Sequence, residues 1–389
     1  MRGPAAPPAV VLELDGLEAL LAELQRRRYR TLGPTVRDGT LTVGPLRTIA
    51  DLPVGWHDEQ APGSYRLARG DDHAHFGWAV GPSSPRSVLF PAQETVWRAR
   101  QAAGAVRFLD PPEPDPPTAL FGIRPCDLAA VAVLDRVLAG GAVADARYAA
   151  RRRHAFLVVA ECGAPSASCF CTSLGTGPAA HQPADLVLCE LDPDQPARHR
   201  FLVRPGSDHG AAVLAAVPHR PATDDDRSRR ATVLADAERR IHRRLDTGGL
   251  PDLLARNLGH PRWAEVARRC LSCGNCTMVC PTCFCSDLDD VTDLAGTVER
   301  RRRWASCFEL GHSYLHGGPV RTSLASRYRQ WATHKLSTWH DQFGTSGCVG
   351  CGRCITWCPV GIDLTDEVAA VRAADGAVDA PGGRSEAIS

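Results

Sequence analysis

The stretch that decides the fold reads Cys270-Leu-Ser-Cys273-Gly-Asn-Cys276-Thr-Met-Val-Cys280-Pro281. The same spacing returns later in the chain as Cys348-Val-Gly-Cys351-Gly-Arg-Cys354-Ile-Thr-Trp-Cys358-Pro359. Gaps of two residues let a tight loop wrap a small object while its backbone amides are directed at the sulfurs. The fourth Cys, followed by Pro, leaves the loop in another direction. The repeated pattern predicts two [4Fe–4S] clusters.

The ligands of each cluster follow from how such motifs pair. In proteins with two motifs, the fourth Cys of each binds the cluster of the other. We therefore assign the first cluster to Cys270, Cys273, Cys276 and Cys358, and the second to Cys348, Cys351, Cys354 and Cys280. Gly274 and Gly352 hold equivalent places in the loops, where a side chain would block close approach of the backbone to the sulfurs.

A structural zinc site is the main alternative, because zinc also binds Cys-x2-Cys pairs. Such a site normally takes two pairs or adds His. The third Cys and the Cys-Pro ending then have no role. Because the whole pattern occurs twice, it favours iron–sulfur clusters over zinc and over chance spacing of buried thiols.

Length and charge narrow the function classes. A chain of 389 residues suggests two or three domains at about 150 residues each. The 45 Lys and Arg residues balance 44 Asp and Glu residues, so no strong overall field attracts nucleic acid or an anionic membrane. The apolar runs fall far short of the roughly 20 residues that span a bilayer. We expect neither nucleic-acid binding nor membrane insertion.

The sixteen cysteines bear on cellular location. Small secreted domains use cysteines as disulfides, but this chain is large, and its start lacks a basic segment followed by an apolar one. The composition therefore predicts reduced thiols and a cytoplasmic protein.

Two domains and a tail are expected. Strand-like runs at 120–123 and 155–160 flank a helix-like run at 128–138, a unit typical of a largely parallel sheet. After Asp226 the pattern turns helical, with no further strand-like run of any length. We expect an α/β N-terminal domain over 1–226 and a mainly α-helical ferredoxin-like dicluster domain over 227–373, in which helices separate the two loops. A flexible tail over 374–389 follows.

Four more cysteines suggest another site. Cys126 and Cys162 each follow one of the expected parallel strands, so both reach the carboxyl edge of the sheet, where α/β ligand sites lie. Cys169 and Cys171 come shortly after. One interpretation is a third iron–sulfur cluster. The alternative is a structural loop with reduced thiols, because the spacing matches no known cluster signature.

The last four cysteines have no assigned ligand role. Cys189 falls inside a strand-like run, which places it in the core. Cys283, Cys285 and Cys307 lie between the two motifs. Packing is the default interpretation for them. Positions beside a cluster, or in another site, remain open.

Three further segments accompany the cluster motifs: Phe121-Gly-Ile-Arg-Pro-Cys-Asp-Leu128, Cys169-Phe-Cys-Thr172 and Arg327-Tyr-Arg-Gln-Trp331. With them, the chain from Phe90 to Arg372 resembles the iron–sulfur β subunit of cytoplasmic sulfhydrogenase-type NiFe hydrogenases. It also resembles the related A subunit of anaerobic sulfite reductase.

The resemblance implies an electron relay without catalytic residues of its own. Single electrons would pass through two [4Fe–4S] clusters between a γ subunit that binds FAD and NAD(P) and a NiFe large subunit, beside a small iron–sulfur δ subunit. Two alternatives stay open. One is the equivalent subunit of an anaerobic sulfite reductase, and the other is a docking or sensor protein whose clusters or zinc only hold the fold.

Overall fold

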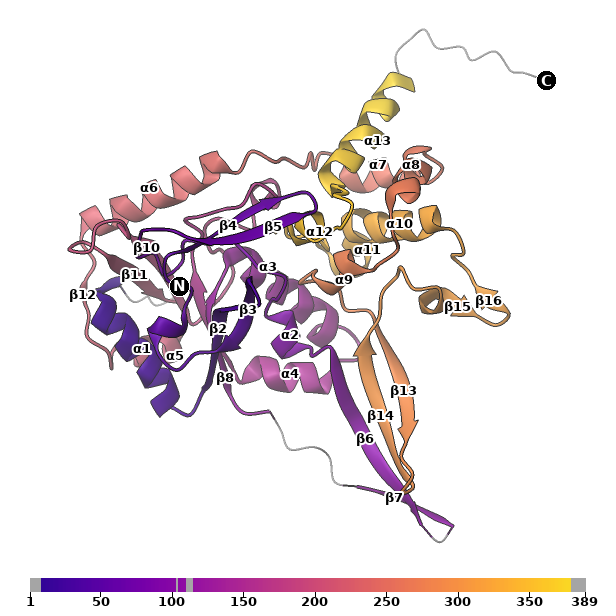
Figure 1. The fold of residues 1–389 in the computed structure, drawn as a ribbon, viewed down its shortest axis with the longest axis horizontal. Coiled ribbons are helices and arrows are strands. Elements are labelled where there is room, and N and C mark those ends of the chain that lie inside the picture. The colour runs from indigo at the N-terminus through magenta and orange to yellow at the C-terminus, as the bar shows by residue number, and fades with distance from the viewer. Residues whose placement is uncertain (1–7, 103, 110–114, 379–389) are drawn as a thin grey trace, which may run out of the picture.

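The body of the protein is built around an eight-stranded sheet in a computed structural model that describes residues 8–102, 104–109 and 115–378 (Figure 1). The strand order is β12-β1-β11-β10-β9-β8-β2-β3. The strands are β1 (Val10–Leu12), β2 (Arg30–Arg37), β3 (Thr40–Pro45), β8 (Thr118–Ile123), β9 (Ala155–Ala160), β10 (Leu186–Leu191), β11 (Arg200–Pro205) and β12 (Arg220–Pro221).

The centre of this sheet is parallel and its edges are antiparallel. Strands β2, β8, β9 and β10 pair in parallel, whereas β3, β11, β1 and β12 join the sheet antiparallel. All six residues of β8 are buried, as expected for a parallel strand covered on both faces. The predicted parallel strands are therefore confirmed for the centre of the sheet only.

Helices cover both faces. The apolar side of α1 (Leu14–Arg26) packs with Phe121 and Phe156 on one face. On the other face, α3 (Pro125–Leu134) and α4 (Ala146–Arg153) pack with Leu120 and Leu157. Neighbouring residues of one strand thus serve opposite cores, because strand side chains alternate. Smaller elements complete this region: α2 (Arg86–Leu89), α5 (Asp208–Leu214), and the hairpin of β4 (Trp56–Ala61) and β5 (Ser64–Arg69).

A second sheet corrects the prediction that no strand follows Asp226. Its order is β13-β14-β6-β7, and it extends away from the body (Figure 1). The strands are β6 (Gln93–Ala102), β7 (Ala105–Phe108), β13 (Ser286–Thr292) and β14 (Thr297–Trp304). Helices therefore do not alone separate the two cysteine loops.

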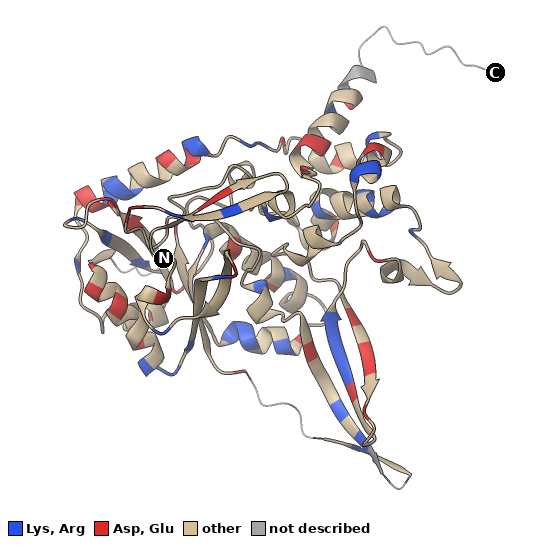
Figure 2. Cartoon of the chain, viewed as in Figure 1, with Lys and Arg blue, Asp and Glu red and all other residues tan. Residues whose placement is uncertain are grey.

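Charge explains why the hairpin escaped the sequence pattern. The run Arg300–Arg303 on β14 faces acidic residues of β13 and β6 (Figure 2). Arg300 pairs with Asp290, and Arg303 pairs with Asp289. Cross-strand charge pairs stabilise a sheet without the apolar alternation by which strands are recognised.

The remaining chain is mostly helical. Its helices are α6 (Asp224–Arg240), α7 (Leu250–Arg256), α8 (Arg262–Arg269), α9 (Asn275–Met278), α10 (Leu324–Thr333), α11 (Trp339–Phe343), α12 (Arg353–Thr356) and α13 (Leu364–Val378). A small hairpin of β15 (Tyr314–Leu315) and β16 (Gly318–Pro319) precedes α10. Within the described ranges, no helix combines the length and apolar character that crossing a membrane requires.

The predicted domain limits fall within helices. The boundary near Asp226 lies in the first turn of α6 and stays a prediction. Helix α13 continues to Val378, into the segment 374–389 that we expected to be a flexible tail. Residues 379–389 lie outside the described residues.

Candidate metal centre

The two cysteine loops have the same local geometry. The backbone N–H of Ser272 donates to Cys270 Sγ at 3.4 Å, and the N–H of Gly350 donates to Cys348 Sγ at the same distance. Both donors have positive φ, 55° and 63°. Each loop then enters a single helical turn, α9 or α12. The amides are thus directed at sulfur, as the spacing predicts.

Gly274 and Gly352 cap these two turns. Their φ angles of 74° and 76° lie in the left-handed region that favours glycine. A Cβ at Gly352 would also come within 2.4 Å of the carbonyl oxygen of Ser168. Backbone conformation therefore favours glycine at both positions, and the neighbouring loop requires it at Gly352.

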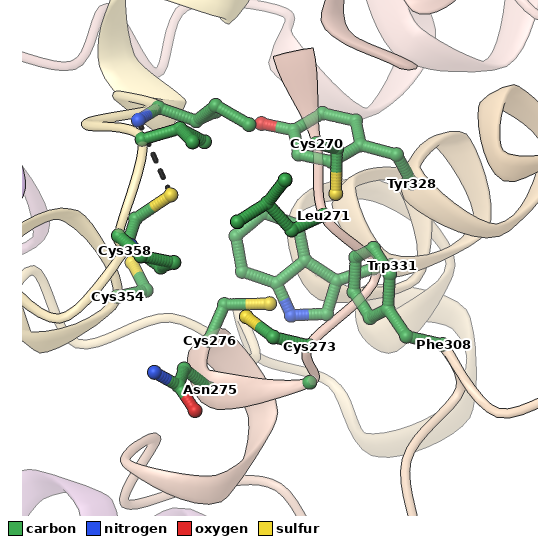
Figure 3. A pocket seen from close by; sticks show the side chains of 14 residues that line it. Cys270, Leu271, Cys273, Asn275, Cys276, Phe308, Tyr328, Trp331, Cys354 and Cys358 are labelled. Carbon is green, nitrogen blue, oxygen red and sulfur yellow. Dashed lines mark hydrogen bonds between the residues drawn. The ribbon is translucent and has the colours of Figure 1, made fainter. Parts of the chain in front are cut away.

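The first predicted set of cysteines lines one hollow. Figure 3 shows three of these side chains on one segment and Cys358 entering from the other. The N–H of Ile362 donates to Cys358 Sγ at 3.3 Å. Aromatic side chains of Phe308, Tyr328 and Trp331 close the hollow. The structure therefore brings Cys270, Cys273, Cys276 and Cys358 together.

The second predicted set also converges. The pKa of Cys354 is raised, and burial is the largest cause. The nearby thiolates of Cys348, Cys351 and Cys280 raise it further. Burial likewise raises the pKa of Cys348 to about 12. Cys354 also lines the hollow of the first set. The two sets are therefore neighbours, and each contains one cysteine from the other motif.

The spacing of the thiols is too wide for a single zinc ion. In the described part of the chain, which includes all sixteen cysteines, no three cysteine sulfurs lie within 4.8 Å of one another. Four thiolates on one zinc at 2.3 Å stand about 3.8 Å apart. The arrangement fits a larger multinuclear cluster better than zinc.

A buried ammonium accompanies the second set. Lys335 is the only lysine in the sequence, and its side chain is 3% exposed. Its Nζ donates to Thr282 Oγ1 at 3.0 Å and to the carbonyl of Gly347 at 3.3 Å. Burial alone would lower the pKa of Lys335, but nearby thiolates, Cys280 first, raise it well above its usual value. The charge therefore stays on this side chain beside the cysteines.

Two buried guanidinium groups lie close by. Arg353 Nη1 is 2.8 Å from Asp127 Oδ1. Arg86 donates to the carbonyl of Cys280 at 2.6 Å and stacks 3.4 Å above the ring of Trp304. Buried cations are costly unless anions compensate them, and thiolate-bound clusters are anionic. Sequence patterns did not single out Lys335 or these arginines. The only feature of the sequence that could have drawn attention to one of these cations is that Lys335 is the single lysine.

The other cysteines occupy three settings. Cys126, Cys162, Cys169 and Cys171 line a second hollow. Cys189 packs in the sheet core beside Val11 and Leu191. Cys283 is buried against Cys280, while Cys285 and Cys307 lie near Lys335. Packing remains a prediction for the last three.

Comparisons with known proteins agree with the iron–sulfur interpretation of the region that contains the two loops. Residues 269–362 match the family model of a 4Fe–4S dicluster domain. Sulfhydrogenase 2 subunit beta of Pyrococcus furiosus is 34% identical over 290 residues, which cover 73% of this chain and 80% of that protein. The chain belongs to the sulfhydrogenase beta subunit family. No solved structure matches it.

Family membership gives the general function of the chain. As a member of the sulfhydrogenase beta subunit family with a 4Fe–4S dicluster domain, the chain is an iron–sulfur electron-transfer subunit. The matched region contains both loops and also the β13–β14 hairpin between them.

Proposed function

We propose that this chain passes single electrons through two [4Fe–4S] clusters held by crossed cysteine sets in a ferredoxin-like arrangement. The ligands would be Cys270, Cys273, Cys276 and Cys358 for the first cluster, and Cys348, Cys351, Cys354 and Cys280 for the second. The observation that carries the proposal is that Cys358 of the second motif lines one hollow with the cysteines of the first motif, whereas Cys280 of the first motif lies near Cys354. Adjoining clusters form a path for electrons.

We further propose a hetero-oligomer. The relative from Pyrococcus furiosus is a subunit of a sulfhydrogenase, and a corresponding complex here would have a γ subunit with FAD and NAD(P), an iron–sulfur δ subunit and a NiFe large subunit. A flavin accepts a hydride and releases its two electrons one at a time, which suits one-electron clusters. The free thiols of all sixteen cysteines support a cytoplasmic location.

The residues of this chain would hold the clusters and set their surroundings, without bond chemistry. N–H donors to sulfur and the aromatic wall of the first hollow tune the potential of a cluster. Cys273 is exposed, and the adjacent Leu271 is 63% exposed, whereas Cys280 and Cys351 are buried. The first cluster would therefore exchange electrons with a partner at the surface near Leu271.

The test is cluster content and one-electron reduction of the full chain, purified without oxygen. We expect about eight iron and eight sulfide ions for the two clusters, and reduction by NAD(P)H only when the flavoprotein partner is present. Cys273→Ala should remove one cluster, while Cys189→Ala, in the sheet core, should remove none. Protein that holds zinc and no iron, or clusters that the flavoprotein cannot reduce, would favour the docking or sensor alternative.

The sulfite reductase alternative concerns the partner rather than this chain. Co-purification with a protein that binds nickel and iron supports the hydrogenase assignment. Co-purification with a sirohaem protein would replace it with sulfite reduction. The electron relay itself would stand in either case.

A further inference from the structure

Four cysteines outside the dicluster loops meet at the carboxyl edge of the central sheet. Cys126 lies in the first turn of α3, directly after β8, and Cys162 follows β9. Cys169 and Cys171 come from the loop that ends in the short turn Cys171–Leu174. All four line the second hollow. Three separate segments thus deliver thiols to one place.

These thiols are close electrostatic neighbours in a dry setting. Burial raises the pKa of Cys169 to about 12, with the thiolate of Cys162 as the next cause. The pKa of Cys171 is raised by burial and then by Cys169 and Cys162. Cys126 is likewise buried, with Cys171 nearby.

A buried cation faces the same hollow. Arg124 is 1% exposed and lines it. Among the described residues, its side chain donates hydrogen bonds to backbone carbonyls only, including those of Phe76 at 2.9 Å and Glu161 at 3.2 Å. Within the described residues, no carboxylate pairs with it. Burial raises the pKa of the Asp58 carboxyl, and the guanidinium lies close enough to oppose that rise without forming an ion pair. A buried guanidinium that forms no ion pair is costly, and an anionic cluster in the hollow would compensate its charge.

The hollow adjoins the second cluster loop. The N–H of Phe170 donates to the carbonyl of Gly350 at 2.9 Å, and Thr176 Oγ1 donates to the carbonyl of Val349 at 2.6 Å. A Cβ at Gly350 would come within 2.7 Å of the backbone of Cys171. Cys351, a ligand in the second set, also lines the hollow. The loop that contains Cys169 and Cys171 is therefore in direct contact with the second cluster loop.

We propose that Cys126, Cys162, Cys169 and Cys171 bind a third [4Fe–4S] cluster. No three of these sulfurs lie within 4.8 Å, which disfavours a single zinc ion. Cys351 borders this site and Cys354 borders the first, so the second cluster stands between the other two. The third cluster would extend the proposed relay at the end opposite Leu271, and its existence does not depend on which partners bind.

The test is iron and acid-labile sulfide in the full chain after anaerobic cluster reconstitution. We expect about twelve iron ions for the wild type. Cys126→Ala and Cys171→Ala should each lose one third of the iron and keep the two dicluster signals. Cys189→Ala is the matched control, because it removes another buried thiol of the same sheet region, and it should keep all the iron.

The wild type decides the question even if a variant fails to fold. Complete reduction with dithionite, followed by spin quantitation, should give three reduced clusters per chain. A fully reconstituted wild type with about eight iron ions would overturn the third cluster and leave the two-cluster proposal intact. Unchanged iron in folded Cys126→Ala, or one zinc ion lost from that variant, would also overturn it. Loss of iron from the wild type altogether would instead refute the proposed function.

Discussion

The ammonium of Lys335 lies 3.0 Å from the hydroxyl of Thr282, and both groups are buried. The same hydroxyl is 3.2 Å from Cys280 Sγ. The one lysine of the chain therefore places a full positive charge within one hydrogen-bonded neighbour of Cys280, a proposed ligand of the second cluster.

Replacing Lys335 with Met should lower the potential of the second cluster. Reduction adds negative charge, which the ammonium stabilises. A charge about 6 Å away at an effective dielectric constant of about 20 contributes about 3 kcal/mol, so a fall of roughly 120 mV is expected for one electron. Potentiometric titration followed by electron paramagnetic resonance measures it. Lys335→Arg keeps the charge and should shift the potential much less. Equal potentials in Lys335→Met and wild type would contradict this role.

Replacing Asp127 with Asn should act in the opposite direction. It leaves the buried Arg353 without its carboxylate partner beside Cys351. The potential of the second cluster should then rise. Breaking a buried ion pair also costs about 3–5 kcal/mol of stability, which denaturant unfolding of the holoprotein measures.

A surface pair provides the control for Asp127→Asn. Asp236 pairs with Arg239, and their side chains are 48% and 71% exposed. Asp236→Asn should cost about 1 kcal/mol at most, and it should leave both potentials unchanged. If the two variants lose similar amounts of unfolding free energy, the buried Asp127 pair contributes no more to stability than the surface pair does.

The crossed ligand sets predict which cluster each fourth cysteine serves. Cys358→Ser should alter the signal of the first cluster, although Cys358 belongs to the second motif. Cys280→Ser should alter the signal of the second cluster. The pairing of each fourth cysteine with its cluster is tested by electron paramagnetic resonance spectra of the two reduced variants. These spectra are compared with those of Cys273→Ala and Cys351→Ala. If Cys358→Ser matches Cys351→Ala, the crossing is wrong.

Gly352→Ala should destabilise the holoprotein more than Gly344→Ala. Both glycines have positive φ, 76° and 67°, so each alanine costs about 1–2 kcal/mol in backbone conformation. At Gly352 the new Cβ also meets the carbonyl of Ser168, whereas Gly344 faces open space. Such overpacking adds about 1–3 kcal/mol. Thermal unfolding of the two variants measures the difference, and equal midpoints would contradict it.

Local sequence patterns were sufficient to predict the two cysteine loops and the central strands. The spacing of Cys270 to Cys280, and its repeat, predicted loops with amides directed at sulfur, because a few consecutive residues determine that geometry. The apolar runs predicted β8 and β9, since strands buried on both faces have such sequences. From the strand ends, the convergence of Cys126 and Cys162 was also foreseeable.

Contacts between segments far apart in the sequence determined the second sheet and the buried cations. The β13–β14 hairpin is held by charge pairs between its own strands and by the pair of Arg302 with Glu94 on β6, which is far away in sequence, so it needs no apolar alternation. The sequence by itself determined which thiols form the two motif loops. Only the tertiary structure decided that Lys335, Arg353 and Arg124 are buried around the cysteine sites. Burial and charge compensation depend on segments that meet only when the chain packs.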